Sequence, residues 1–441
     1  MVAKFDQRQG SSDGGAILLQ AAERRLALTS ALAAGLRDDR QPGKVQHELR
    51  ELITQRVMAI ALGYEDANDA ARLGCDPIHK LLVGRDPFDG QDLASQPTLS
   101  RFENTPGRRE LLRMAEALAD CVIERHRKRL HGRAGRITID LDPTDDPTHG
   151  AQQLSFFNRH YDSHCYLPMV GFLTFNDEAE QYLVAAVLRP GNAPGSAGAV
   201  GILRRLIRRV KEAFPAARIR VRLDGGFASP KVLDFLDGEP KVEYLVNLAA
   251  NAVLKRKVES AMKRARWQSE ISDQTEHVYG QCRYATRQTW PWKRRVIYKA
   301  EVVRAANKEP KDNPRFVVTN LKQSPQWIYE QVYCPRGDVE NRLKELHDGM
   351  QIGRTSCSNF WANTFRVVLT AAAYVLMQEM RLHLAKTRHA RAQVSTLRDR
   401  FLKLGAQVVV SVRRIVLHLP QSFPYLDGFQ HLALCLGAQT G

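Results

Sequence analysis

Two aspartates that each follow a short alternating stretch are the first residues in this sequence that could do chemistry. In residues 137–141 isoleucine and leucine alternate with polar residues, among them Asp140, and Asp142 comes directly after them. Residues 218–223 alternate between arginine and apolar residues, and Asp224 follows. A period of two predicts β-strands. In a mixed sheet these two strands can be neighbours, which would bring their terminal carboxylates together.

Paired carboxylates of this kind fit a site for divalent metal ions. Oxygen ligands suit Mg²⁺, with Mn²⁺ as a substitute, and a third carboxylate from a nearby helix would complete the set. Two such ions about 4 Å apart can activate an attacking oxygen and stabilise a leaving oxygen at phosphorus. The simpler alternative is that each aspartate only starts a turn. A calcium loop that begins at Asp140 is excluded, because Asp145 stands where such a loop requires glycine.

The stretch of residues 333–347, YCPRGDVENRLKELH, predicts a helix with two different faces. The apolar positions, expected to be buried, are Val339, Leu343, Leu346 and Met350. The positions of the second face are Arg336, Glu340, Lys344 and His347. A single carboxylate among cations is an unusual composition for plain surface. The alternative is a solvated face with i,i+4 ion pairs, each worth roughly 0.2–0.5 kcal/mol.

The composition favours a soluble cytoplasmic protein that binds a polyanion. The 441 residues carry a net charge of +17, so nucleic acid is the first candidate partner and a membrane surface the second. The seven cysteines form no CxxC pair, which argues against a zinc ribbon or a disulfide framework. No signal peptide opens the chain, and the most apolar run, residues 367–377, is too short to span a bilayer. No phosphate-binding G-x-x-x-x-G-K-[ST] motif occurs.

The periodicity changes along the chain in a way that indicates an α/β protein. Residues 1–130 are expected to be helical, and a short helix capped by Thr98 carries Arg101 in its first turn. Helix-turn-helix modules place DNA-contacting residues there, although an ordinary capped helix is the alternative. From residue 137 onward a meander of three strands is followed by alternating helix and strand. That is the order of a ribonuclease-H-like domain.

The interval between Asp224 and Glu340 is too long for a simple crossover connection. It holds a helical stretch and then a β-like region that is rich in aromatic and basic residues. Trp290 and Trp292 precede three cations in this region, which is a composition suited to base stacking and phosphate contact. The alternative is that both tryptophans fill a small core of the insertion.

Together these motifs resemble the DDE transposases of bacterial insertion sequences, in the group with a Tyr-x2-Arg-x3-Glu-x6-Lys signature. Tyr333, Arg336 and Glu340 match that signature. His347 stands where the family has lysine, so Lys344, one turn earlier, is expected to substitute for it in phosphate contact. The segments ITIDLDPTDDPTHG and VRLDGGFA resemble the two strands that carry the aspartates of the family.

The resemblance implies a catalytic trio of Asp142, Asp224 and Glu340 that holds two Mg²⁺ ions, with Mn²⁺ as a substitute. Asp140 is the alternative first ligand, and the Asp-x-Thr spacing favours Asp142. The expected DNA contacts are Tyr333, Arg336, Lys344, His347, Trp290, Trp292 and Arg101.

It also implies a division of the chain and an activity. Residues 1–130 would form an all-α DNA-binding region, and residues 131–385 a ribonuclease-H-like domain with a β-rich insertion at about 252–325. Residues 386–441 are a basic segment without an assigned role. The expected activity is metal-dependent cleavage and strand transfer at the terminal inverted repeats of double-stranded DNA, by a homodimer at the bacterial nucleoid. Two alternatives stay open, namely a catalytically inactive repeat-binding protein and a ribonuclease-H-like nuclease without strand transfer.

Overall fold

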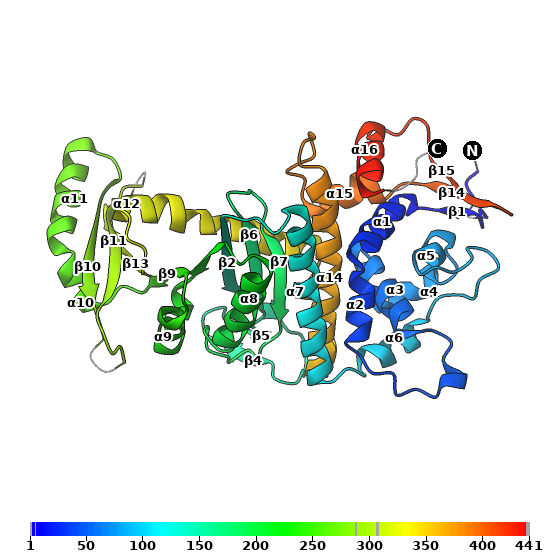
Figure 1. The fold of residues 1–441 in the computed structure, drawn as a ribbon, viewed down its shortest axis with the longest axis horizontal. Helices are drawn as coiled ribbons and strands as arrows, with labels where there is room; N and C mark the ends of the chain where they lie inside the picture. Colours follow the sequence, from blue (N-terminus) through cyan, green and yellow to red (C-terminus); the bar gives the residue numbers. More distant parts are fainter. Residues whose placement is uncertain (1, 5, 287–288, 306–307, 438–441) are drawn as a thin grey trace.

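The structure is a computed structural model, and it describes residues 2–4, 6–286, 289–305 and 308–437. Its elements are arranged along one long axis (Figure 1). Helices of the N-terminal region and the C-terminal segment lie at one end, a sheet occupies the middle, and the insertion lies at the other end. Residues 287–288 and 306–307 of the predicted β-rich insertion lie outside the described residues.

The middle of the molecule is a mixed sheet. Its central strands are β2 (Arg136–Pro143), β6 (Met169–Phe175), β7 (Tyr182–Val187), β8 (Arg218–Leu223) and β9 (Val242–Leu248), and the insertion adds β10 (Glu276–Tyr284), β11 (Arg294–Val303), β12 (Lys311–Asp312) and β13 (Arg315–Thr319). The order is β10-β11-β13-β9-β8-β2-β6-β7, with β12 paired to β11. β2 is antiparallel to β6 and parallel to β8. The prediction that the two aspartate-bearing strands are neighbours is therefore confirmed.

One predicted strand is divided in the structure. The pattern predicts a single strand over residues 166–175, but β5 (Ser163–Tyr166) ends before Pro168 and β6 begins after it. Proline has no N–H to donate to a ladder, so the chain leaves one sheet there and enters another. β5 lies instead in a small sheet with β3 (Asp146–Pro147) and β4 (Phe156–Asn158).

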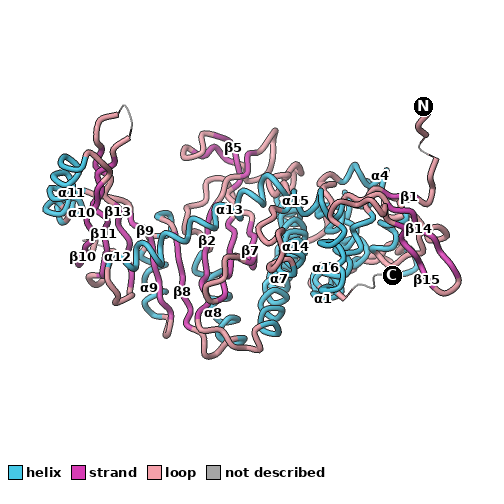
Figure 2. The backbone as a smooth tube through the Cα atoms, turned by 90° about the horizontal axis from the view of Figure 1, so that it is seen from above, coloured by secondary structure: helices cyan, strands magenta, loops and turns pink. Residues whose placement is uncertain are grey.

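The two faces of β2 and β8 differ in chemistry because side chains alternate along a strand. The isoleucines and leucines of both strands join the core with buried residues of α8 (Ala199–Ala213) and α9 (Pro230–Gly238). The opposite face is polar. A continuous helical segment lies on it, built from α12 (Pro325–Trp327), a π-helical turn (Ile328–Tyr333), a tight turn (Cys334–Gly337), α13 (Asp338–Lys344) and a second π-helical turn (Glu345–Gly349). In Figure 2 this segment follows one path across the strands.

The N-terminal helices are α1 (Ile17–Leu26), α2 (Leu28–Ala34), α3 (Leu49–Ala61), α4 (Ala70–Leu73), α5 (Pro77–Leu82), α6 (Gln96–Glu103) and α7 (Arg108–Arg129). α6 begins at Gln96 rather than at the predicted Thr98, since Ser95 has the extended backbone of the cap and Pro97 suits the first turn. The region is not purely helical, because β1 (Gly10–Ser11) pairs with β14 (Ala406–Ser411) of the C-terminal segment.

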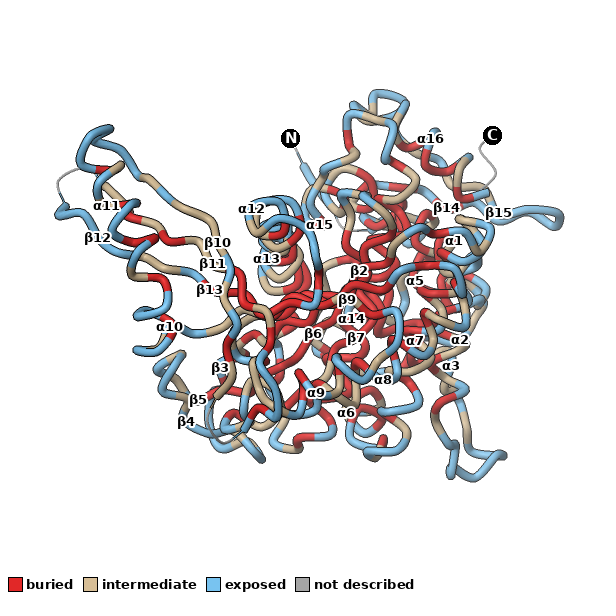
Figure 3. The backbone as a smooth tube through the Cα atoms, turned by 60° about the vertical axis from the view of Figure 1, so that its left-hand side comes forward, coloured by how far each residue is buried: buried red, intermediate tan, exposed pale blue. Residues whose placement is uncertain are grey.

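α14 (Phe360–His383) is the central helix of the core. Within the described residues it is the one helix long and apolar enough to cross a membrane, but 94% of its apolar window is buried inside the protein. It packs against α3, α7 and β7. The remaining elements are α10 (Ala252–Lys257), α11 (Glu259–Ser272), α15 (Val394–Leu397), β15 (Arg414–His418) and α16 (Leu426–Leu436). Figure 3 shows buried residues running through the sheet and α14, with exposed residues at the β14–β15 hairpin.

Candidate active site

Asp142 and Asp224 lie at the same edge of the sheet because their strands run in register. Leu141 pairs with Leu223 in the parallel ladder of β2 and β8, and each aspartate is the next residue along its chain. The Asp224 carboxylate accepts a hydrogen bond from the Gly226 N–H at 2.9 Å. Burial raises the pKa of Asp142 to about 7, and the neighbouring carboxylates add to this rise. Buried carboxylates placed together favour a cation between them.

Asp140 has a different surrounding from Asp142, although both project from the polar face of β2. Its two carboxylate oxygens accept hydrogen bonds from Arg222 Nε and Nη2 at 2.8 and 2.7 Å. Arg222 Nη1 also donates to the carbonyl oxygen of Val332 at 3.1 Å, which ties the sheet to the helical segment. Both oxygens of Asp140 are therefore engaged in a fully buried bidentate pair.

Arg336 supplies the positive charge that faces Asp142. Its Nη2 lies 2.9 Å from Asp142 Oδ1. The Nε and Nη2 groups of Arg336 are buried, and within the described part of the chain neither makes a hydrogen bond of good geometry. Donors in this state can donate hydrogen bonds to an anionic oxygen such as that of a phosphate. Tyr333 is half-buried next to this group, and burial raises the pKa of its hydroxyl, with nearby Arg336 opposing the rise.

The other residues of the predicted helix face do not converge on the aspartates. Glu340 and Lys344 are exposed, and neither side chain has a hydrogen bond or an ion pair among the residues that the structure describes. His347 is half-buried, and its Nε2 lies 2.8 Å from Thr144 Oγ1. Burial lowers the pKa of His347, so the ring is neutral at pH 7. Lys344 is therefore a cation without a partner among the described residues, whereas His347 is neutral and hydrogen-bonded.

The residues at the sheet edge fit a divalent cation in chemistry, although the expected trio is not assembled. Nowhere in the described ranges do three or more histidine, cysteine, aspartate or glutamate side chains gather closely enough to hold a metal ion. Asp142 and Asp224 supply hard oxygen donors, and the guanidinium of Arg336 already lies beside Asp142 as a positive charge. Glu340 lies in solvent and remains available as a further ligand.

The two tryptophans of the insertion have different roles in the structure. Trp290 is 7% exposed and packs edge-on against Tyr284, so it belongs to the core of the insertion. Trp292 is 50% exposed. The guanidinium of Arg294 lies over both rings, 4.9 and 5.0 Å from their centroids, and also pairs with Asp237. Only Trp292 therefore has a ring free for stacking.

Arg101 lies on the outer side of α6. The inner side of this helix is committed to packing, since Phe102 contacts Phe365 of α14 edge-on at 5.2 Å between ring centroids. Glu103 pairs with Arg56 at 2.8 Å in the buried interior. Arg101 is exposed, and its side chain contacts only the Thr98 hydroxyl, at 3.4 Å, within the described residues.

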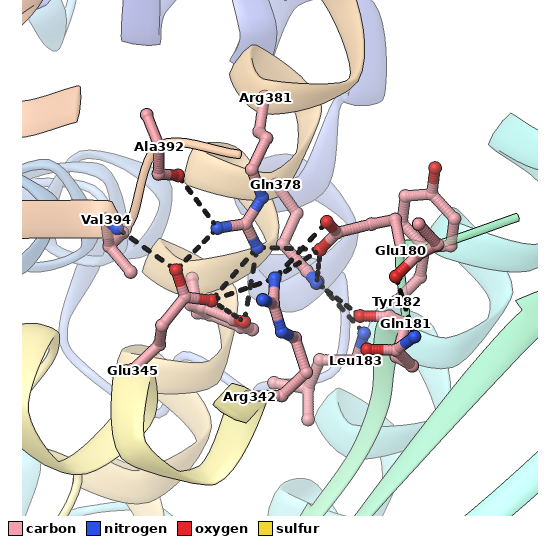
Figure 4. A network of polar contacts seen from close by, with 12 residues as sticks. Glu180, Gln181, Tyr182, Leu183, Arg342, Glu345, Gln378, Arg381, Ala392 and Val394 are labelled. Atoms are coloured by element: carbon pink, nitrogen blue, oxygen red, sulfur yellow. Dashed lines mark hydrogen bonds and ion pairs between the residues drawn. The ribbon is translucent and has the colours of Figure 1, made fainter. Parts of the chain in front are cut away.

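A ring of buried charges joins the helical segment to α14, and sequence reasoning missed it (Figure 4). Arg381 donates to Glu345 at 2.6 Å and to Glu180 at 2.7 Å. Arg342 contacts the same two carboxylates, each at 3.1 Å. Tyr374 donates its hydroxyl hydrogen to Glu345 at 2.8 Å. Charged residues at the end of the long apolar run of α14, Arg381 among them, were the available signal, because a buried arginine requires a carboxylate partner.

Asp146, the first residue of β3, leads to a prediction about pH. It is fully buried, Thr355 Oγ1 donates to its Oδ2 at 2.7 Å, and burial raises its pKa to about 8. The folded protein therefore keeps a proton that the unfolded chain loses near pH 4, so this residue should reduce stability as pH rises from about 4 to 8. Asp146→Asn should raise stability at pH 8 by on the order of 2 kcal/mol and leave it nearly unchanged at pH 4. Thermal unfolding at several pH values measures this.

The matched control is Asp145→Asn, which changes the charge of the adjacent, less buried residue by the same amount. Its unfolding temperature should follow the pH profile of the unmodified protein. If the Asp146→Asn protein kept the same profile as well, the assignment of the pH dependence to Asp146 would be wrong.

The chain matches a known protein family. A family model described as transposase DDE domain group 1 matches residues 1–439 of the chain. No curated protein sequence matches the chain.

Proposed function

The chain belongs to the DDE transposase family, and on that basis we propose that it binds the terminal inverted repeats of a mobile element, cleaves the DNA there and transfers the freed strand to target DNA. Members of this family act on DNA and use divalent metal ions. The observation that supports the proposal most is the parallel pairing of Leu141 with Leu223, which places Asp142 and Asp224 together opposite Arg336.

Asp142, Asp224 and Glu340 are the proposed catalytic carboxylates. Asp142 and Asp224 are held by strand ends, and Glu340 is free of protein partners among the described residues, so its carboxylate is available to join them. Mg²⁺ held by these oxygens would activate the attacking oxygen and stabilise the leaving oxygen. Asp140 is better explained as the partner of Arg222 than as a ligand, because both of its oxygens are already occupied.

Cationic and aromatic residues around the carboxylates would position the DNA. Arg336 has two buried donors that can bind a phosphate near the cut. Tyr333 lies next to it, and Lys344 is the exposed cation farther along the same helical segment. Trp292 offers an exposed ring for a base displaced from the duplex. Arg101 on the outer side of α6 would contribute to recognition of the repeats.

We propose further that the protein acts as a homodimer that joins two DNA ends, in the cytoplasm at the nucleoid. The net charge of +17 supports a polyanionic partner. A catalytically inactive repeat-binding protein is the weaker alternative, because all three carboxylates are present in the sequence. A nuclease without strand transfer would retain the same carboxylates and differ only in the second reaction step.

The test uses labelled DNA that carries the end of the element. Cleavage at the repeat boundary is expected with Mg²⁺ and should disappear with a chelator. Glu340→Ala should abolish the cleavage and leave DNA binding intact, since Glu340 is exposed and makes no contact that stabilises the fold in the described structure. Tight binding without any cut in Mg²⁺ and in Mn²⁺ would refute the catalytic proposal, and cleavage without strand joining would favour the nuclease.

A further inference from the structure

The helices α10 and α11 of the insertion have one apolar side and one basic side. α11 packs against β10 and β11, and the buried residues of the two helices and their junction are Leu254, Val258, Ala261, Met262 and Ala265. The opposite face of the same strands is covered by the helical segment that leads to Arg336, since Ile328 and Val332 cluster there with Ile297 and Val317. The basic side of α10 and α11 therefore faces away from the candidate active site, at the end of the molecule (Figure 1).

The outward face of α10 and α11 carries five exposed cations, Lys255, Arg256, Lys257, Lys263 and Arg264. None of the five side chains forms an ion pair or a hydrogen bond with any residue that the structure describes. The nearest acid along the chain, Glu259, pairs instead with Arg266 at 2.9 Å. Two exposed arginines of α8 differ in this respect, because Arg205 pairs with Glu116 and Arg208 lies 3.9 Å from Glu212. The cluster on α10 and α11 is thus an uncompensated positive surface.

Two large apolar side chains continue the same face. Trp267 is 62% exposed and Ile271 is 67% exposed. They follow Lys263 at offsets of four and eight, so all three lie along one side of α11. A tryptophan beside unpaired cations matches nucleic-acid surfaces, where cations contact phosphates and aromatic rings contact sugars and bases.

We propose that this outward face of α10 and α11 is a second DNA-binding surface, which contacts a DNA segment other than the one at Asp142 and Asp224. The proposal rests on the DNA-binding part of the proposed function. Because the sheet separates the two faces, one straight duplex cannot lie on both. The surface therefore fits a second duplex brought in by the assembly. Its contacts are to phosphates, so binding there is independent of sequence.

The test compares two variants of the full chain that lose the same charge. Lys263→Gln with Arg264→Gln removes two unpaired cations, and Arg205→Gln with Arg208→Gln removes two cations that already have carboxylate neighbours. Binding to a short random-sequence duplex, without the ends of the element, is measured between about 50 and 200 mM salt. The slope of log K against log salt should fall by about two for the α11 variant, and far less for the α8 variant.

Fluorescence gives an independent readout, because the chain has five tryptophans. Trp267→Phe should remove a large part of the intensity change that the duplex causes, whereas Trp361→Phe, on α14, should not. Equal loss of slope in both charge variants, or binding of anionic lipid vesicles in preference to the duplex, would overturn the proposal. No step of this test depends on cleavage, so its failure and the failure of the catalytic proposal are distinguishable.

Discussion

Asp142→Asn is expected to abolish metal-dependent DNA cleavage in a protein that remains folded, whereas Asp140→Asn is expected to lower the stability of the fold. Among the described residues the Asp142 carboxylate forms an ion pair with Arg336 and with no other side chain, so its loss should remove a metal ligand and reduce the cleavage rate by roughly 10³-fold or more. Asp140 holds the buried guanidinium of Arg222 with both oxygens. Its loss should cost about 3–5 kcal/mol of unfolding free energy. Cleavage rates and thermal unfolding of both variants measure the difference.

A double variant supplies the control for Asp140. Asp140→Leu together with Arg222→Met removes both buried charges, and it should recover much of the stability that Asp140→Asn loses. If Asp140→Asn unfolded at the normal temperature but no longer cleaved DNA, while Asp142→Asn stayed active, the roles of the two aspartates would have to be exchanged.

The position of the carboxylates could be predicted because it follows from local pattern. A period of two fixes which residues share a face of a strand, and the order of strands and helices makes β2 and β8 neighbours. The choice between Asp140 and Asp142 could not be made from pattern alone, since both lie on the same face of β2. It depends on Arg222, which is 82 residues away in the sequence, and on which aspartate lies closer to the edge.

The helical segment shows where local pattern fails. Three of the four predicted apolar positions, Val339, Leu346 and Met350, are fully buried, and the fourth, Leu343, is half-buried. The polar residues predicted to share a second face do not share one. The chain forms a tight turn at Cys334–Gly337 and a π-helical turn at Glu345–Gly349 instead of one regular α-helix. These departures rotate the side chains, so Arg336 meets Asp142 while Glu340 points to solvent. They are stabilised by tertiary contacts of Glu345, which no helical periodicity can show.

The strands of the insertion could be predicted from the sequence, but which of its residues are buried could not. A β-rich composition between residues 275 and 319 indicates strands, and β10, β11 and β13 are present. From the sequence alone Trp290 and Trp292 are equally suited to base stacking or to a core, because they are separated by one residue and precede the same cations. The two tryptophans differ in burial, since Trp290 packs against Tyr284 and Trp292 does not. The outward basic face of α11 likewise becomes visible only when the buried face is known.

Arg381→Ala is expected to cause the largest loss of stability of any single substitution in the charge ring of Figure 4. Arg381 is 4% exposed and pairs with both Glu180 and Glu345, so its loss leaves two buried carboxylates with Arg342 as their shared cation. Removing one partner from a buried pair costs about 3–5 kcal/mol. Because Glu345 begins the π-helical turn that follows α13, the position of the segment carrying Glu340 should loosen as well. Urea unfolding measures the first effect, and hydrogen exchange of residues 338–349 measures the second.

Arg391→Ala is the matched control for this substitution. A cavity beside the charge ring is lined by Glu180, Arg342 and Arg381, and Arg391 lines it as well. Arg391 is exposed, and its side chain forms no ion pair within the described residues. Its loss should change the unfolding free energy by less than about 0.5 kcal/mol. A conservative change, Arg381→Lys, keeps the charge but cannot reach both carboxylates in one plane, so it should recover only part of the stability. If Arg381→Ala were as stable as Arg391→Ala, the ring would be unnecessary for holding α13 in place, and another contact would have to explain the position of Glu345.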